Sequence, residues 1–137
     1  MPEYTGTRLN DEIKISRLYT VHYFEYSKRF SFTGESHDFW ELVYADKGDV
    51  TVFADDKSFV LEQGNVIFHK PNEWHNVRAN GVDAANITII TFASPSKAMS
   101  FFENKILSVG QKQKELLSKI VSEYTNAFKT PLNDPYT

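Results

Sequence analysis

Two carboxylates and an imidazole stand at alternate positions in the stretch "ESHDFWELVYADKG", residues 35–48. Side chains alternate across a β-strand, so Glu35, His37 and Glu41 would share one face of such a strand. Phe39 belongs to the same face. A buried Glu41 without a partner would cost several kcal/mol, so this face requires a cation, a metal or strong hydrogen-bond donors. His37 could supply a hydrogen bond, and a divalent metal could bind both residues.

A second stretch, "GNVIFHKPNEWH" at residues 64–75, supports a polar site inside the fold. A glycine turn leads into a strand, a proline ends that strand, and His75 follows. His75 would approach His37 and Glu41 only where the fold brings the two strands together. The opposite face of the first strand also carries large apolar groups such as Trp40, so periodicity alone leaves open which face points inward.

The elements that must position these residues are mostly β-strands. Between Leu18 and Phe92, short stretches rich in aromatic and β-branched residues alternate with turn residues about every 8 to 12 positions. This spacing predicts an antiparallel sandwich or a small barrel. The predicted strands cover residues 18–26, 39–45, 49–54, 57–62, 66–70 and 85–93, and residues 29–32 are a candidate continuation of the sheet.

The pattern changes from strand to helix after residue 93. In residues 96–106, Ser96 is a candidate N-cap, and Met99, Phe102 and Ile106 recur at helical spacing. We therefore expect a first helix there.

A second helix is predicted over residues 111–128, where apolar residues form a continuous stripe. The stripe consists of Leu116, Leu117, Ile120, Val121, Tyr124 and Phe128. Such a stripe packs against a core more often than it binds a partner. Two helices alone cannot bury it, so part of it must meet the barrel, another subunit or additional sequence.

The composition favours a single cytoplasmic domain and excludes several function classes. The chain has 137 residues, of which 41% are hydrophobic and 15% aromatic, enough for a core. Its net charge of −3 argues against nucleic-acid binding by this domain alone, because phosphate contacts need clustered Lys and Arg. The sequence has no cysteine, which excludes disulfides and thiolate metal sites. We see no secretory signal and no apolar stretch of the roughly 18 residues that a membrane span needs.

The first stretch resembles the first signature of the cupin superfamily, whose fold is a small double-stranded β-barrel. In that signature a His-x-His pair precedes a Glu and then a Gly. His37, Glu41 and Gly48 match it in spacing, and Glu35 stands where the family has its first His.

The second stretch resembles the second cupin signature, a glycine-led strand that ends near a His. Gly64 and His75 match that signature. The sequence departs from it at Lys70, which replaces a Pro, and at Asn72, which replaces a Gly. Ala79 stands in place of its final Asn.

More narrowly, the chain from Leu18 to Phe128 resembles the N-terminal effector-binding domain of AraC-type transcriptional regulators. The resemblance implies a mainly β fold, a double-stranded β-barrel of the cupin or jelly-roll type followed by two C-terminal α-helices. It also implies a DNA-binding domain of two helix-turn-helix units, which has no counterpart in this sequence. The expected divisions are an N-terminal arm with the first strand entry (1–17), a cupin-like barrel (18–93), a helical dimerisation segment (94–130) and a truncated linker (131–137).

The predicted function is effector sensing and dimerisation without catalysis. The effector would be a small polar molecule, a sugar or related metabolite, because sugar recognition combines carboxylates and imidazoles with aromatic faces. The expected partners are that effector, a second copy through the C-terminal helices, and DNA only through the missing domain, with no membrane. The predicted ligand-binding residues are Glu35, His37, Phe39, Glu41, Trp74, His75 and Tyr23.

A divalent metal is the alternative occupant of the same site. Zn, Ni, Mn or Fe could bind His37, Glu41 and His75, with Glu35 as a fourth ligand. The competing function is therefore a metal-dependent cupin enzyme, a dioxygenase or isomerase, although the missing first histidine of the signature argues against it. The two other histidines, His22 and His69, are assigned structural roles.

Overall fold

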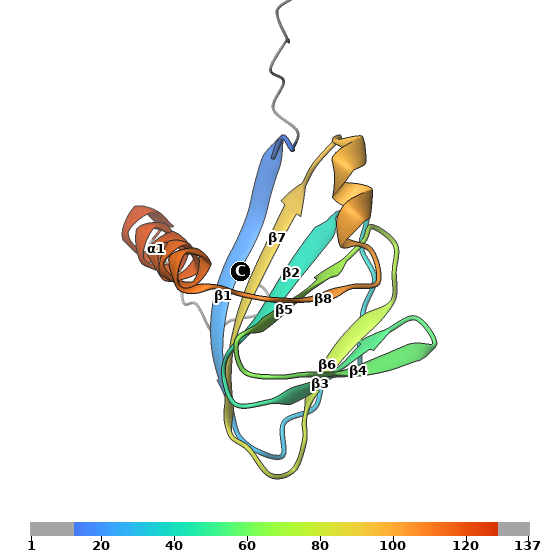
Figure 1. Ribbon diagram of the computed structural model, residues 1–137, viewed down its shortest axis with the longest axis vertical. Coiled ribbons are helices and arrows are strands. Elements are labelled where there is room, and N and C mark those ends of the chain that lie inside the picture. Colours follow the sequence, from blue (N-terminus) through green and yellow to red (C-terminus); the bar gives the residue numbers. More distant parts are fainter. Residues whose placement is uncertain (1–12, 129–137) are drawn as a thin grey trace, which may run out of the picture.

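The computed structural model describes residues 13–128, which form two antiparallel sheets that face each other (Figure 1). The larger sheet has the strand order β1-β7-β2-β5-β8, and the smaller has the order β4-β3-β6. The strands are β1 (Arg17–Tyr26), β2 (Trp40–Lys47), β3 (Val50–Ala54), β4 (Lys57–Leu61), β5 (Asn65–His69), β6 (His75–Ala79), β7 (Ala85–Ala93) and β8 (Ile106–Ser108). The arm at residues 1–12 and the linker at residues 131–137 lie outside the described residues.

The predicted fold class is confirmed: the protein is mainly β, and its two antiparallel sheets pack face to face as a β-sandwich. The two sheets remain separate and are not joined into one closed ring. The hydrophobic core lies between them and includes Val43, Val52 and Ile87, each at most 2% exposed. This packing leaves one end of the space between the sheets to polar side chains.

Six strands follow the predicted ones within two residues at each end, and two strands were missed. β6, with the sequence HNVRA, contains only one β-branched residue and exists because it pairs with β3 along its whole length. The candidate continuation at residues 29–32 contributes only one isolated bridge, between Ser31 and Arg78. Local propensity does not identify a strand whose stability comes from its neighbour.

Left-handed backbone conformations occur where the turns require them. Gly48, between β2 and β3, has φ 73°, and Asp55, in the tight β3–β4 hairpin, has φ 52°. Asn72 has φ 67° and stands where the second cupin signature has a glycine. Asn is one of the few residues other than Gly that adopt this conformation readily, so the replacement preserves the turn.

The first predicted helix is wrong in type and length. The chain forms a short 3-10 helix, η1 (Lys97–Phe102), and then strand β8. Ser96 makes no side-chain hydrogen bond to cap η1, and Asn104 adopts φ 56°, which is incompatible with a continuing helix. Ile106 pairs with Ile67 of β5, so sheet pairing determines the structure there. Among residues 13–128 there is thus one α-helix, α1 (Gln111–Phe128), where two were expected.

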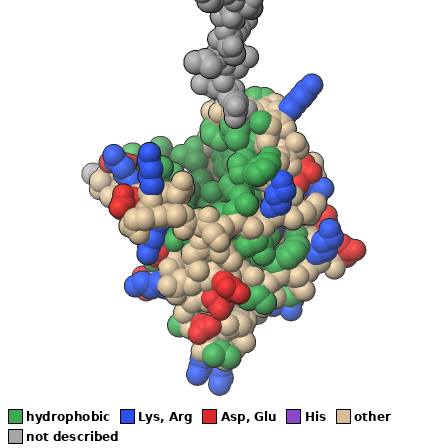
Figure 2. Space-filling view, viewed as in Figure 1, with side chains coloured by type: hydrophobic (Ala, Val, Ile, Leu, Met, Phe, Trp, Pro, Cys, Tyr) green, Lys and Arg blue, Asp and Glu red, His purple; other side chains and the backbone are tan. Residues whose placement is uncertain are grey.

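α1 covers part of the outer face of the larger sheet, beside β1 (Figure 1). Its side chains Leu117, Val121 and Tyr124 pack against the outer-face cluster, which consists of Val21, Trp40, Ile90, Phe92 and Met99. Figure 2 shows apolar side chains in the hollow between α1 and η1. The other half of the stripe stays in solvent: Leu116, Ile120 and Phe128 are 52%, 40% and 60% exposed. The helices that residues 13–128 form include none long and apolar enough to cross a bilayer.

Candidate functional site

A cavity of about 340 Å³ lies between the two sheets. Its walls come from β1, β2, β5, β6 and β7 and from residues 32–39, which lead into β2. The polar lining residues are Thr20, His22, Thr33, Glu35, His37, Glu41, His69, His75, Asn76 and Thr91. The apolar side chains that line it are Phe24, Phe32, Phe39, Val43, Val77 and Ile89.

Strand register separates the polar end of the cavity from the apolar end. Glu41 of β2 pairs with His69 of β5 on one side and with Thr91 of β7 on the other. Two residues further along β2, Val43 pairs with Ile89 of β7. A polar row therefore crosses three strands, with an apolar row directly below it that belongs to the core.

The residues predicted to share one face do so. Glu35, His37, Phe39, Glu41 and Val43 all line the cavity, although only the last two belong to β2. Residues 35 and 75 form an isolated bridge, with N–O distances of 3.0 and 2.9 Å in the two directions. The segment before β2 is thus fastened to β6, which brings its carboxylate and imidazole into the cavity.

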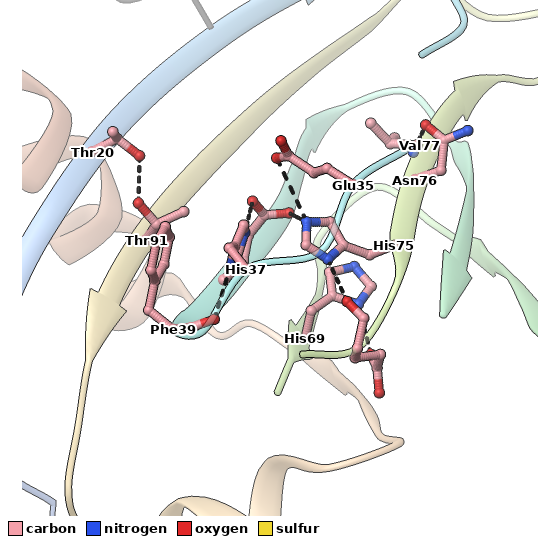
Figure 3. A network of polar contacts seen from close by, with 11 residues as sticks. Thr20, Glu35, His37, Phe39, His69, His75, Asn76, Val77 and Thr91 are labelled. Carbon is pink, nitrogen blue, oxygen red and sulfur yellow. Dashed lines mark hydrogen bonds and ion pairs between the residues drawn. The ribbon is translucent and has the colours of Figure 1, made fainter. Parts of the chain in front are cut away.

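The side chains of Glu35, His37 and His75 lie close to that of Glu41 and form a group of four with it (Figure 3). Nε2 of His75 lies 3.2 Å from Oε2 of Glu41 and 3.7 Å from Oε1 of Glu35. Nε2 of His37 lies 3.4 Å from Oε1 of Glu41. One ligand atom from each of the four residues lies within 4.8 Å of all the others. The fold thus brings together the four residues that were predicted as metal ligands.

Backbone carbonyls orient both imidazole rings. Nδ1 of His37 donates to the carbonyl of Phe39 at 2.9 Å, and Nδ1 of His75 donates to the carbonyl of Glu73 at 3.0 Å. Each ring therefore directs Nε2 toward Glu41. The buried Nε2 of His75 makes no well-aligned hydrogen bond with any described residue, despite its short distance to Glu41.

This donor set fits a divalent metal. Metal-binding histidines commonly donate their second ring nitrogen to a carbonyl, as His37 and His75 do, and the remaining nitrogen then binds the ion. Two imidazoles and one or two carboxylates suit Zn, Ni, Mn or Fe(II). The hydrogen bond that His75 Nε2 lacks is consistent with a further group at this point.

Electrostatics favour a charged cluster when no metal is bound. Burial raises the pKa of Glu41, but its contacts with His37 and His75 outweigh burial and lower the pKa to about 2. Burial lowers the pKa of His75, but its contacts with Glu35 and Glu41 outweigh that effect and raise the pKa to about 10. The contact with His75 also lowers the pKa of Glu35. His75 is then an imidazolium between two carboxylates at neutral pH, and a metal would have to displace its proton.

Sequence reasoning missed a second buried pair behind the cluster. Nδ1 of His69 lies 2.9 Å from Oε1 of Glu73, and these side chains are only 1% and 5% exposed. The ring of His69 stacks on that of His75, with centroids 4.7 Å apart. Glu73 therefore holds both rings, one through its carboxylate and one through its carbonyl. The spacing of four residues between His69 and Glu73 repeats that between His37 and Glu41, and this repeat is the signal in the sequence that points to the pair.

All four histidines of the sequence line the cavity. His22 and His69, which the sequence analysis assigned structural roles, are both part of the wall and are 6% and 1% exposed. His22 lies at an even position of β1, and His69 lies at an odd position of β5. The pairing of each strand with its neighbour determines which of its two faces points into the cavity.

Two predicted site residues lie outside the cavity. Tyr23 is on the outer face of the larger sheet, where its hydroxyl donates to Asp46 at 2.6 Å and accepts from Asn86 at 3.1 Å. Trp74 is 38% exposed and covers Gly34 from outside, where an added Cβ would lie 2.2 Å from the indole ring. Each directly neighbours a cavity histidine in sequence, so alternation turns it to the other side.

Residues 17–115 match the family of AraC-like ligand-binding domains. No curated protein matches the chain. Among solved structures, apo ToxT K231A from Vibrio cholerae is similar with a TM-score of 0.54 and 12% identity, covering 76% of this chain and 46% of that chain. The cupin domain of Schizosaccharomyces pombe Cnp3 is similar with a TM-score of 0.51 and 11% identity, covering 62% and 64%.

An RmlC-like cupin from Shewanella frigidimarina is 23% identical, with a TM-score of 0.47 and coverage of 56% of this chain and 66% of that chain. The chain thus spans less than half of the ToxT chain and slightly under two thirds of the other two. At these identities, the likeness to ToxT and Cnp3 concerns the fold alone.

Proposed function

Because the chain belongs to the family of AraC-like ligand-binding domains, we propose that it senses a small polar effector in a regulator of transcription. The effector, a sugar or related metabolite, binds in the cavity between the sheets, and the domain itself has no catalytic role. The observation that carries this proposal is the group of two carboxylates and two imidazoles, of which Glu41 and His75 are buried, that opens into about 340 Å³ of space.

The lining supports a sugar in two ways. Glu35 and Glu41 accept hydrogen bonds from hydroxyl groups, and the histidines donate or accept them. Phe39 stacks on the rings of His37 and Tyr19, at 4.0 and 4.3 Å between centroids, and adds apolar surface to the cavity wall beside the polar groups. Small-molecule sites typically combine such apolar walls with a few polar groups. The proposed binding residues are therefore Glu35, His37, Phe39, Glu41 and His75.

A thermal-shift screen of sugars tests this proposal. A ligand at a hundred times its Kd stabilises the folded state by about 2.7 kcal/mol, which is readily visible. Glu41→Gln should abolish the shift produced by a binding sugar. Tyr23→Phe is the matched control, because Tyr23 lies on the outer face of the sheet, and it should preserve the shift. An unchanged shift in Glu41→Gln would contradict binding at this cavity.

We further propose that the domain dimerises through α1 and thereby controls a DNA-binding domain in the full-length protein, in the cytoplasm. Exposed Leu116, Ile120 and Phe128 support this, because apolar side chains in a row on a helix favour a partner surface. Leu116→Asp with Ile120→Lys should convert a dimer into a folded monomer in light scattering. Val60→Asp, on β4 and 62% exposed, is the control and should leave the mass unchanged. An unchanged mass in the helix variant would remove α1 from the interface.

A metal-dependent cupin enzyme is the second candidate function, favoured by four possible ligand atoms within 4.8 Å of one another, one of which belongs to His75, whose Nε2 makes no hydrogen bond within the described part of the chain. His37, Glu41 and His75 would hold the ion, with Glu35 as the fourth ligand. A bound Zn, Ni, Mn or Fe would supply Lewis acidity at the polar end of the cavity. Two measurements separate the candidates. By elemental analysis, an enzyme should contain stoichiometric metal that is lost in His75→Ala. In a binding assay, the sensor should bind its sugar in the presence of chelator.

A further inference from the structure

The cavity has an uneven distribution of charge. Glu35 and Glu41 contribute two carboxylates, and among the described residues that line the cavity none is Lys or Arg. Arg78, at the end of β6, is exposed and lies over the ring of Phe53 at 4.8 Å from its centroid. Fixed positive charge is therefore absent from the described wall, whereas fixed negative charge is present at its polar end.

The histidines do not reverse this balance. Nδ1 of His75 is engaged with the carbonyl of Glu73, and its Nε2 faces the carboxylates of Glu35 and Glu41. A proton on His75 is thus already neutralised by two carboxylates. Nδ1 of His69 is likewise directed at the Glu73 carboxylate, at 2.9 Å. An incoming anion would meet the carboxylates of Glu35 and Glu41 with no Lys or Arg in the described wall to compensate for its lost hydration.

The carboxylate of Glu35 is accessible to a molecule bound in the cavity. Its side chain is 67% exposed at the mouth of the cavity, whereas the side chain of Glu41 is 8% exposed inside. The backbone bridge to His75 fixes the position of Glu35 without using its carboxylate. One end of a bound molecule would therefore lie against a carboxylate that remains accessible to it.

We propose that the cavity selects its sugar by charge, with Glu35 as the specificity-determining residue: it prefers amino sugars to neutral sugars and excludes acidic ones. The inference rests on the proposed sugar-binding function. An ammonium group brings a positive charge to the carboxylates, so its hydrogen bonds to them are also ion pairs, whereas a hydroxyl contributes a hydrogen bond alone. A uronic acid of the same size places a third carboxylate beside those of Glu35 and Glu41, in a described wall without Lys or Arg.

Isothermal titration of chelator-treated protein with matched sugars tests the proposal. The probes are a hexose, its 2-amino derivative and its uronic acid, each in the gluco, galacto and manno configurations. In the configuration that binds, the amino sugar should bind at least about tenfold more tightly than the acid, because its ammonium group forms a charge-assisted hydrogen bond where the acid meets charge repulsion. The neutral sugar should fall between them.

Substitution at Glu35 separates charge selection from shape. Glu35→Gln keeps the size and the backbone bridge, and should reduce the preference for the amino sugar over the acid by about threefold or more. Glu25→Gln, on the outer face of β1, removes the same charge outside the cavity and should leave the preference unchanged. An acid that binds as tightly as the amino sugar, or a preference that survives Glu35→Gln intact, overturns this inference alone. Failure of every probe to bind overturns the sugar-sensing function as well.

Discussion

Removing Glu41 and His75 singly and together should show that losing one member of the pair destabilises the fold more than losing both. Oε2 of Glu41 and Nε2 of His75 are 3.2 Å apart, and both residues are at most 6% exposed. At that distance two unit charges attract by about 5 kcal/mol for an effective dielectric constant of about 20, a gain that desolvation largely offsets. The net value of the pair is therefore small, whereas an unpaired buried charge is costly.

The two single variants should differ in cost. His75→Leu leaves the Glu41 carboxylate buried beside His37 alone, and should lower the free energy of unfolding by about 3 kcal/mol. Glu41→Leu should cost less, because His75 keeps its contact with Glu35 and, unlike a buried carboxylate, can release its proton near neutral pH. The double variant replaces both charges with apolar groups and should lie within about 1 kcal/mol of the wild type.

Urea denaturation at pH 7 in the presence of chelator measures these free energies, since a bound metal would link the same side chains. The slope of the unfolding free energy against urea concentration should be the same in all variants, so that the urea midpoint reports stability directly. In a thermal scan, His75→Leu should lower the Tm by about 10 °C for a domain of this size. If the double variant loses as much as the two single variants combined, the residues act independently and the proposed pairing is wrong.

Three further predictions concern the pH dependence of stability, the contact between Gly34 and Trp74, and the outer-face cluster. The pKa of His75 is raised to about 10 from an ordinary 6.5 and that of Glu41 is lowered to about 2 from 4.5, so their stabilisation is complete between pH 4.5 and 6.5. It should decline as pH rises toward 10 or falls toward 2, and urea midpoints across pH should be flatter in the double leucine variant. Gly34→Ala should lower the Tm, because φ is +88° and the new Cβ would lie 2.2 Å from Trp74; adding Trp74→Ala should restore part of the loss. Met99→Ala should cost about 2–5 kcal/mol in urea denaturation, because Met99 is 2% exposed between η1 and the larger sheet.

The strands and the polar face were predictable because both depend on local alternation. Glu35, His37 and Glu41 stand two or four positions apart, and that spacing places them on one side of an extended chain whatever the rest of the fold does. The face that points inward was not predictable in the same way. It follows from the pairing of β2 with β5 and β7, which the sequence of one strand does not contain.

The missed features all depend on contacts between distant segments. β8 forms because Ile106 meets Ile67 of β5, although its own sequence continues a helical pattern. His69 enters the cavity because β5 pairs with β2 in a register that sets it opposite Glu41. Glu73 is buried because the turn before β6 folds under both rings. Pairings of this kind are non-local, so residue spacing alone does not reveal them.

The position of the four histidines makes the protein its own spectroscopic probe. No histidine occurs elsewhere in the 137 residues, so every imidazole resonance of histidine-labelled protein arises from the cavity wall. Carbon-13 labelling of this one residue type would yield a four-signal spectrum in which tautomers, titration and occupancy by a metal or sugar are read without background. A purification tag free of histidine preserves that property.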